Sequence, residues 1–493
     1  MVDDEATLRF GPSDPSNSGP LLAFPALTIV WHPNLDRVGQ IALLETLILG
    51  SGVVHLSRAE PDFLVPGLDD GQPLAHPAIG RREAPALDIR FEKGGFKLER
   101  RDQGIEVQVN LEPLAGSRNL SPEEVRAGVM ITVGRHFVFC LHLVQSPITR
   151  SAVPGLLGTS DAIEDLRRSV LRAARKKTFV LLRGESGTGK ELAARALHEA
   201  GPRAKGPFVP VNMANLEAGQ ARAELFGHRK GAFTGATADV PGHFRSAAGG
   251  TIFLDEIGYL TSEVQPMLLR VLDDHEILPL GTSKPQKVDV RVVAATDRNL
   301  EEWVKEKRFE LPLYNRLESA VSIALAPLRE RREDVGCLLV HFLRNEAGDA
   351  AEFRHFLDDR PLSHPWLFAR DIAAVALSPL PANARDLLGL ARNLLHKATD
   401  PPYDTHRVVK KFLAGRASGS NQHGASIVRG RSTAHTEPTN DQILASLEKF
   451  HGNREDAAAY LGISRSTLWR LIDDRPELKR IIKQRWPGPH RKS

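Results

Sequence analysis

The stretch FVLLRGESGTGKELAARALH, residues 179–198, constrains the fold of this chain more than any other segment. A short apolar run leads into a loop that contains Gly184, Gly187 and Gly189, and Lys190 then opens a helical pattern. Glycines let backbone N–H groups turn inward around an anion, the helix N-terminus adds its positive end, and the lysine supplies a point charge. The pattern predicts a phosphate-binding loop in a parallel α/β sheet, and an ordinary glycine-rich turn is the alternative.

A second strand pattern, GTIFLDEIG, ends in Asp255 and Glu256. In a nucleotide site of this kind the first carboxylate holds Mg²⁺, and the second orients and deprotonates the attacking water. Glu191 stands where a Ser or Thr hydroxyl normally ligates Mg²⁺, so metal binding depends on Asp255 and Glu256. The two segments predict hydrolysis of ATP with Mg²⁺. The expected ATP contacts in the loop are Gly184, Glu185, Ser186, Gly187, Thr188, Gly189, Lys190 and Glu191.

Length and composition indicate a multidomain globular protein. The 493 residues exceed what one hydrophobic core serves, and 41% hydrophobic with 26% charged residues is ordinary for a soluble chain. No apolar run approaches the roughly 20 residues of a membrane helix, and the acidic N-terminus differs from a secretory signal. Cys140 and Cys337 lack the spacing of a zinc site or a disulfide framework. We expect a cytoplasmic, nucleoid-associated protein.

Changes in pattern divide the chain into units. Short β-branched runs fill residues 26–146 and predict an all-β domain after a flexible leader at 1–25. A linker at 147–155 leads to alternating helices and buried strands from residue 156, which predict a mostly parallel sheet. A second linker, 414–438, is rich in Gly, Ser and Arg.

The last unit, residues 439–493, reads as three helices. A tight turn at Gly462 and an N-cap at Ser464 join the second and third helices, as in a helix-turn-helix, and a generic helical hairpin is the alternative. The residues expected to face DNA are Arg465, Ser466, Thr467 and Arg470. The basic tail after Arg475 adds sequence-independent attraction to DNA, although such a tail is often only a solvated end.

Several motifs together resemble one family. GESGTGKE, FVPVN, ELFGH followed by GAFTGA, GGTIFLDEIG, VRVVAATDRNL and PLRERREDV occur in the order found in the central AAA+ domain of bacterial sigma-54-dependent transcriptional activators, or enhancer-binding proteins. The resemblance divides this region into an α/β ATPase core at 156–325 and a helical lid at 326–413. In that family a glutamate also follows the loop lysine, as Glu191 does here. The C-terminal unit resembles the Fis-type helix-turn-helix of the same activators.

The resemblance implies roles for further residues. Asn212 would be the switch that holds the catalytic Glu256, and Thr296 would sense the γ-phosphate. Arg316 matches an arginine finger that reaches the neighbouring subunit's site, and Arg385 matches the second sensor in the lid. The loop that would contact sigma-54 comprises Gly231, Ala232, Phe233, Thr234, Gly235 and Ala236. A buried turn with Phe233 in the core is the alternative for this loop.

The chain also departs from the family pattern. Glu310 replaces a second arginine after the phenylalanine at residue 309, with Arg308 as a possible substitute, and Asp297 replaces the usual asparagine after Thr296. The lid segment reads LPANARDL at 380–387 where WPGNVREL is usual. These changes leave ATP binding expected and put the full hydrolytic rate in question, because they touch transition-state stabilisation.

The N-terminal strand order resembles a weakened forkhead-associated (FHA) domain, a β-sandwich that reads phosphothreonine. The usual Ser-Arg-x-His is Gly-Arg-Arg-Glu at 80–83, and Asn110 is followed by leucine in place of glycine. Arg81 and Asn110 would be left to hold a phosphate and a peptide backbone. A sandwich that serves only as a regulatory or packing module is the alternative.

The combined expectation is a sigma-54-dependent activator. It would bind enhancer-like DNA as a dimer, assemble an AAA+ hexamer and remodel the closed complex of sigma-54 RNA polymerase, gated through a phosphothreonine protein. The alternative is an ATP- and DNA-binding regulator or scaffold with little or no hydrolysis. A replication loader would not explain ELFGH with GAFTGA.

Overall fold

The structure is a computed structural model that describes residues 23–47, 52–65, 71–92, 94–145, 153–217, 219–348, 366–397 and 404–417, with residues 443, 444 and 447. It divides into two compact units, Met1–Gln422 and His423–Ser493. The expected DNA-contacting residues Arg465, Ser466, Thr467 and Arg470 lie outside the described residues. Within the described part, no helix is long and apolar enough to cross a membrane.

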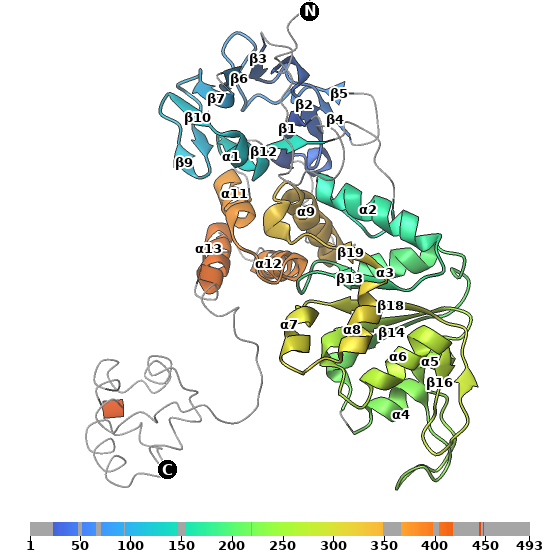
Figure 1. Ribbon diagram of the computed structural model, residues 1–493. Coiled ribbons are helices and arrows are strands. Elements are labelled where there is room, and N and C mark those ends of the chain that lie inside the picture. The colour runs from blue at the N-terminus through green and yellow to red at the C-terminus, as the bar shows by residue number, and fades with distance from the viewer. Residues whose placement is uncertain are drawn as a thin grey trace, which may run out of the picture. The chain divides into compact units, whose positions relative to one another are not determined.

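The N-terminal domain is a β-sandwich of two antiparallel sheets, as expected for an all-β unit (Figure 1). The larger sheet has the order β5-β4-β2-β1-β12-β11-β8-β9, and the smaller has the order β10-β7-β6-β3. One short helix, α1 (Pro122–Arg126), precedes β11. The strands are β1 (Phe24–Trp31), β2 (Ile41–Leu43), β3 (Val53–Leu56), β4 (Phe63–Leu64), β5 (Gly71–Gln72), β6 (Leu87–Glu92), β7 (Gly95–Arg100), β8 (Val107–Val109), β9 (Glu112–Pro113), β10 (Ser117–Leu120), β11 (Val129–Val133) and β12 (Phe137–Val144).

The core of the sandwich comes from alternate residues of the two sheets. Leu27 and Ile29 of β1 meet Ile89 of β6 and Leu98 of β7 in one buried cluster, as the period of two in a strand requires. β1 starts at Phe24, so the ordered domain begins within the segment predicted as a leader.

The central domain is a five-stranded parallel sheet with the order β14-β15-β18-β13-β19. Alternate strand residues face two apolar clusters: Leu254 belongs to one cluster and Phe253 to the other, so both faces of the sheet are covered. The five strands are β13 (Val180–Arg183), β14 (Phe208–Asn212), β15 (Thr251–Asp255), β18 (Arg291–Thr296) and β19 (Val321–Ala324). The helices are α2 (Asp161–Ala174), α3 (Lys190–Glu199), α4 (Ala221–Phe226), α5 (Gly242–Ser246), α6 (Gln265–Asp274), α7 (Leu300–Lys305) and α8 (Leu311–Glu318), and a small ribbon pairs β16 (Glu276–Ile277) with β17 (Gln286–Lys287).

A group of helices follows the sheet and forms the lid. These are α9 (Asp334–Ala347), α11 (Ala369–Leu377), α12 (Ala384–Lys397) and α13 (Thr405–Ala417), and they share one apolar core. α13 continues to Ala417, beyond the lid boundary predicted at residue 413. At the other end of the domain, Val153 is buried with Ile163 of α2, so this residue of the predicted linker 147–155 belongs to the core.

Candidate nucleotide site and partner loop

Three neighbouring strands bring the predicted catalytic segments to one edge of the parallel sheet. β18 lies between β13 and β15, so the loop after β13, Thr296 at the end of β18 and Asp255 at the end of β15 are adjacent. The loop is joined to β18 directly, because Gly184 N–H donates to the Thr296 carbonyl over 3.2 Å. Ligands of open α/β sheets bind at this carboxyl edge.

The glycine-rich loop has the backbone conformation that an anion cradle needs. Gly187 and Gly189 have φ values of +78° and +103°, which non-glycine residues rarely adopt, and Gly189 is the N-cap of α3. A Cβ at Gly187 would lie 2.0 Å from the Ala382 carbonyl oxygen, so a side chain has no room there. The loop amides and the α3 N-terminus therefore fit a polyphosphate.

Lys190 lies at the centre of the site and is buried. Its Nζ donates to the Gly184 carbonyl over 2.8 Å and lies 3.7 Å from Oε1 of Glu256. The ammonium group is thus held between the loop and the acidic pair, where it can bind phosphate oxygens as a point charge. Glu191, the next residue, is exposed and lies 3.6 Å from Arg195 across one turn of α3.

The acidic pair, Asp255 and Glu256, is partly buried. Burial raises the pKa of Glu256 to about 7, Lys190 opposes the rise, and Asp297 and Asp255 add to it. Burial also raises the pKa of Asp255, again opposed by Lys190. Glu256 has a φ of +56° in the left-handed region, a conformation that clusters at functional sites. A carboxylate whose pKa lies near the working pH suits general-base chemistry.

Asn212 and Thr296 flank this pair. Asn212 is level with Asp255 in the β14–β15 register, and its Oδ1 accepts from Ala214 N–H over 2.9 Å. In this state the Asn212 side chain caps the next turn, and Glu256 faces Lys190. Thr296 is buried, and its hydroxyl oxygen accepts from Arg298 N–H over 3.0 Å.

The lid reaches the phosphate loop through the segment that departs from the family pattern. Arg385 donates to the Ser186 hydroxyl over 2.5 Å, and Ala384 N–H donates to the Gly187 carbonyl over 3.1 Å. The substitutions at 380–387 therefore still deliver Arg385 to the loop.

Two positioning residues, Arg329 and Asn383, were missed by the sequence analysis. Arg329 makes two contacts of 2.7 Å with the Glu185 carboxylate, a bidentate geometry that fixes this loop side chain. Asn383 is fully buried; its Oδ1 accepts from Leu328 N–H over 2.7 Å and its Nδ2 donates to the Ser186 carbonyl over 3.0 Å. Arg329 lies in the motif PLRERREDV and Asn383 lies in LPANARDL. These two motifs were the sequence signal that could have identified both residues.

The donor set fits ATP and Mg²⁺. Inward amides, Lys190 and Arg385 offer positive groups for phosphates, and Asp255 offers a carboxylate for a phosphate-bound cation. Among the described residues, no group of three or more His, Cys, Asp or Glu side chains is arranged as a metal site on its own.

Arg316 lies on α8, outside the residues gathered around Lys190. Its Nε is 2.7 Å from Oδ1 of Asp273, and Nη2 donates to the Leu272 carbonyl over 2.9 Å. The guanidinium also lies over the Phe179 ring. Within one chain this arginine is bound by its own subunit.

The departures at 297, 308 and 310 have different surroundings. Arg298 lies 3.1 Å from Asp297 and balances its charge. Arg308 stacks on the Trp303 ring at 4.0 Å from the ring centre. Glu310 is an exposed N-cap of α8 whose N–H donates to Gln265 over 2.7 Å.

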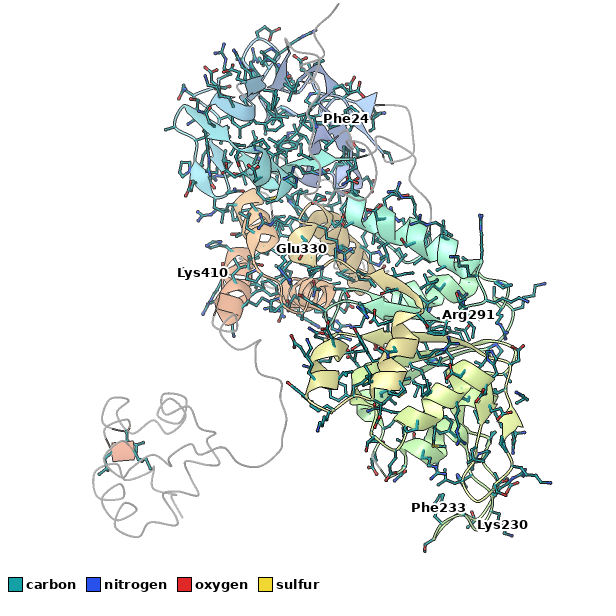
Figure 2. The ribbon with its side chains drawn as sticks, in the orientation of Figure 1. Phe24, Lys230, Phe233, Arg291, Glu330 and Lys410 are labelled. Carbon is teal, nitrogen blue, oxygen red and sulfur yellow. The ribbon has the colours of Figure 1, made fainter. Side chains whose placement is uncertain are left out.

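The GAFTGA loop projects from the central domain. Figure 2 shows Phe233 and Lys230 at the tip of a loop that points away from the rest of the domain. Phe233 is 46% exposed and its ring meets the His228 ring edge-on, so the alternative of a core phenylalanine is wrong. Gly231 and Gly235 both have positive φ, and a Cβ at either would meet nothing within 4 Å. Their role is therefore the turn geometry and not close packing.

On the sandwich, Arg81 and Asn110 have unequal surroundings. Arg81 is exposed in a short bridge with Ala84. Asn110 has a positive φ, and its Oδ1 accepts from Met130 N–H over 2.9 Å. The amide oxygen of Asn110 is thus engaged within the domain.

Comparison with known families gives two matches. A family model described as the sigma-54 interaction domain matches residues 156–323, and one described as the Fis family of bacterial regulatory proteins matches residues 440–473.

Individual relatives agree with these matches. The DNA-binding transcriptional regulator NtrC of Salmonella typhimurium is 38% identical over 342 residues, which cover 65% of this chain and 70% of that protein. The Nif-specific regulatory protein of Bradyrhizobium diazoefficiens is 51% identical over 190 residues, 38% of this chain and 32% of that protein. Among solved structures, NtrX of Brucella abortus in complex with ADP has 30% identity and a TM-score of 0.46, covering 65% of this chain and 68% of that chain.

Proposed function

This chain belongs to the family of sigma-54-dependent transcriptional activators, and from that premise we propose that it couples ATP hydrolysis in an AAA+ ring to remodelling of the closed complex of sigma-54 RNA polymerase. The observation that carries the proposal is the pairing of a phosphate loop and acidic pair with a projecting GAFTGA loop in one domain. The loop offers an exposed phenyl ring and the hydroxyl of Thr234 to a partner, and we assign sigma-54 as that partner.

Each residue of the site has a role in this reaction. The loop amides, Lys190 and Arg385 bind the phosphates, and Asp255 holds the Mg²⁺. When bound, Mg²⁺ neutralises the charge that builds up on the phosphate oxygens. Glu256 accepts the proton of the attacking water as the water oxygen bonds to the γ-phosphorus and the bond to the β–γ bridging oxygen breaks. Thr296 senses the γ-phosphate, and Asn212 exchanges partners to release Glu256.

Assembly supplies the remaining group. Arg316 is bound by Asp273 of its own subunit and lies at the end of α8, from which it would reach a neighbouring site in a hexamer as an arginine finger. We assign DNA binding to the Fis-type unit, which would bind enhancer-like sites as a dimer. The residues that would contact DNA are Arg465, Ser466, Thr467 and Arg470. We propose that the protein acts in the bacterial cytoplasm at the nucleoid, because its proposed partners are DNA and RNA polymerase.

We propose that the N-terminal sandwich regulates this ATPase activity. As an FHA-like domain, it would bind a phosphothreonine protein, and the exposed side chain of Arg81 would contact the phosphate group. The engagement of Asn110 with Met130 makes Arg81 the stronger of the two assignments.

A DNA- and ATP-binding scaffold without hydrolysis is the second candidate, because Glu310 reverses a charge that the family uses. Two observations favour hydrolysis. Arg298 balances Asp297, and the altered lid segment still brings Arg385 to the loop.

The test is the ATPase rate as a function of protein concentration. Hydrolysis that needs a neighbouring Arg316 rises more steeply than the protein concentration and disappears in Lys190→Ala. The matched control is Lys176→Ala, which changes an exposed lysine outside the site. A rate that stays at background where rings form would rule out the enzymatic function.

A further inference from the structure

Part of the outer face of the large sheet of the sandwich is apolar and packs against the lid. We propose that the sandwich and the lid form one permanent body, so that the N-terminal domain regulates the nucleotide site by moving the lid and not by detaching from it. The contact itself stands on the structure, and its regulatory consequence rests on the proposed function.

The core of the contact is as dry as a domain interior. Val30 and Trp31 of β1, Met130 of β11 and Val138 and Cys140 of β12 point away from the sandwich core and are 0–3% exposed. They join one cluster with α9, α11 and α12 of the lid, including Leu339, Ile372 and Leu390. Buried contacts of this apolar kind characterise obligate interfaces, and dissociable domain contacts are more polar.

Backbone approaches confirm how tightly the two parts meet. A Cβ on Gly336 of α9 would lie 1.8 Å from the Val30 carbonyl oxygen, so only glycine allows this helix to touch β1. Ala369 N–H, at the start of α11, donates to the Arg135 carbonyl in the β11–β12 turn over 3.0 Å. Contacts between main chains hold position more strictly than contacts between flexible side chains.

Polar groups close the rim of the same surface. Arg344 of α9 pairs with Asp36 of the sandwich, and Arg332 donates to the Gly128 carbonyl over 3.2 Å. Inside the contact, His142 Nδ1 of β12 lies 3.9 Å from Glu333, just before α9, and both residues are buried. An apolar centre with a polar rim is the usual anatomy of a specific interface.

The lid carries this contact to the nucleotide. α12 packs on α9 in the shared core, and the turn before α12 contains Asn383, which donates to the Ser186 carbonyl of the phosphate loop. A displacement of the sandwich therefore displaces Asn383 and Arg385 at the loop. Because coupling is reciprocal, a ligand that shifts the sandwich changes ATP affinity and ATP changes the affinity for that ligand by the same factor.

Cys140 reports on separation directly, because its thiol lies in the centre of the contact. Burial raises the pKa of the Cys140 thiol, so maleimide reacts with it only after opening. In a full-length Cys337→Ser variant, we expect labelling of Cys140 to differ by less than about 10-fold between the ATP-bound, ADP-bound and DNA-bound protein. A rise of about 100-fold in any of these states would show detachment and overturn the proposal.

Two α9 variants calibrate this measurement. Gly336→Leu places a side chain against Val30 and should expose Cys140, giving fast labelling. Asn345→Leu makes a similar change on the exposed side of the same helix and should leave Cys140 protected. If Gly336→Leu does not fold, urea-unfolded protein supplies the fast reference rate. Equal protection of Cys140 in a folded Gly336→Leu variant would overturn the proposed contact.

Crosslinking tests the functional consequence. In the test variant, Asp36→Cys and Arg344→Cys are joined by a short bis-maleimide, which ties the sandwich to the lid. In the control variant, Glu346→Cys and Arg392→Cys are joined in the same way and tie two lid helices across a 2.9 Å ion pair. We expect both crosslinked proteins to keep the ATPase rate of their untreated forms. Loss of activity only in the first pair would overturn the proposal. If ATPase is absent from every form, the proposed function fails, and the labelling of Cys140 still decides whether the two parts separate.

Discussion

At the scale of single residues, the nucleotide site is held from the lid side. Arg329 and Asn383 contact the loop residues Glu185 and Ser186, so the protein's own side chains fix the position of the loop. Preorganised groups avoid an ordering cost during the reaction. Asn383 also accepts a hydrogen bond from Leu328 N–H in the lid, so its side chain links the lid backbone to the phosphate loop.

Replacing Asn383 should weaken ATP binding. Asn383→Ala leaves Leu328 N–H and the Ser186 carbonyl without their buried partner, and such losses cost about 1–3 kcal/mol. We expect ATP affinity to fall by about 10-fold, measured by titration with a fluorescent nucleotide analogue. Asn393→Ala, an exposed asparagine of α12, is the control. Equal affinities of the two variants would contradict the positioning role.

Glu333 should make stability depend on pH. Burial raises its pKa to about 8, with Asp334 and Asp161 adding to the rise and Arg331 opposing it. His142 faces it from β12, and Arg332 and Cys140 lie nearby. The folded chain binds this proton more tightly than the unfolded chain, so the stabilisation is complete below about pH 4.5 and is lost as pH rises to about 8.

Glu333→Gln keeps the group neutral and should flatten this dependence. The wild-type unfolding temperature should fall between pH 5 and 8 relative to the variant, by an amount that reflects a few kcal/mol. Thermal unfolding followed by circular dichroism measures it, with the exposed Glu330→Gln as control. Parallel curves for all three proteins would show that Glu333 titrates as it does in water.

At the scale of elements, the GAFTGA loop separates contact from chemistry. Thr234 is exposed and follows Phe233, which Figure 2 shows at the loop tip. Thr234→Ala should abolish transcription activation and leave the ATPase rate largely unchanged, because the hydroxyl is lost only from the partner contact. In vitro transcription and phosphate release measure the two activities. Thr237→Ala, an exposed threonine just beyond the loop, should retain both activities, and equal loss of both in Thr234→Ala would refute the assignment.

Sequence patterns predicted the elements that carry the chemistry, because a few consecutive residues are enough to specify each of these elements. The glycines and Lys190 specify the phosphate loop within a few residues, and the site residues share one sheet edge as a consequence of parallel topology. The contact between sandwich and lid joins Val30 to Gly336, which are distant in sequence, and no local rule pairs them. A signal existed in β12, FVFCLHLV, whose residues are apolar on both faces and therefore need a partner on each.

At the scale of the whole molecule, the described chain is a single subunit of the proposed ring. Arg316 is bound by Asp273, so its service to a neighbour requires that this pair break on assembly. An exposed ion pair of this kind contributes at most about 1 kcal/mol, and a subunit interface can replace it readily. The geometry of the assembled ring would then determine how much ATPase activity is lost through the departure from the family pattern at Glu310.

Glu310→Arg tests this cost. Glu310 is exposed at the start of the helix that carries Arg316, and a positive charge there restores the family pattern. In the ring it should stabilise the charge on the transferring phosphate of the neighbouring subunit and raise kcat about 10-fold, as one added transition-state contact does. The gain should appear only at concentrations where rings form, because the contact crosses between subunits. Glu302→Arg, on exposed α7, makes the same charge change as a control. A gain that persists in dilute monomer, or that Glu302→Arg reproduces, would show a general charge effect and remove Glu310 from the finger.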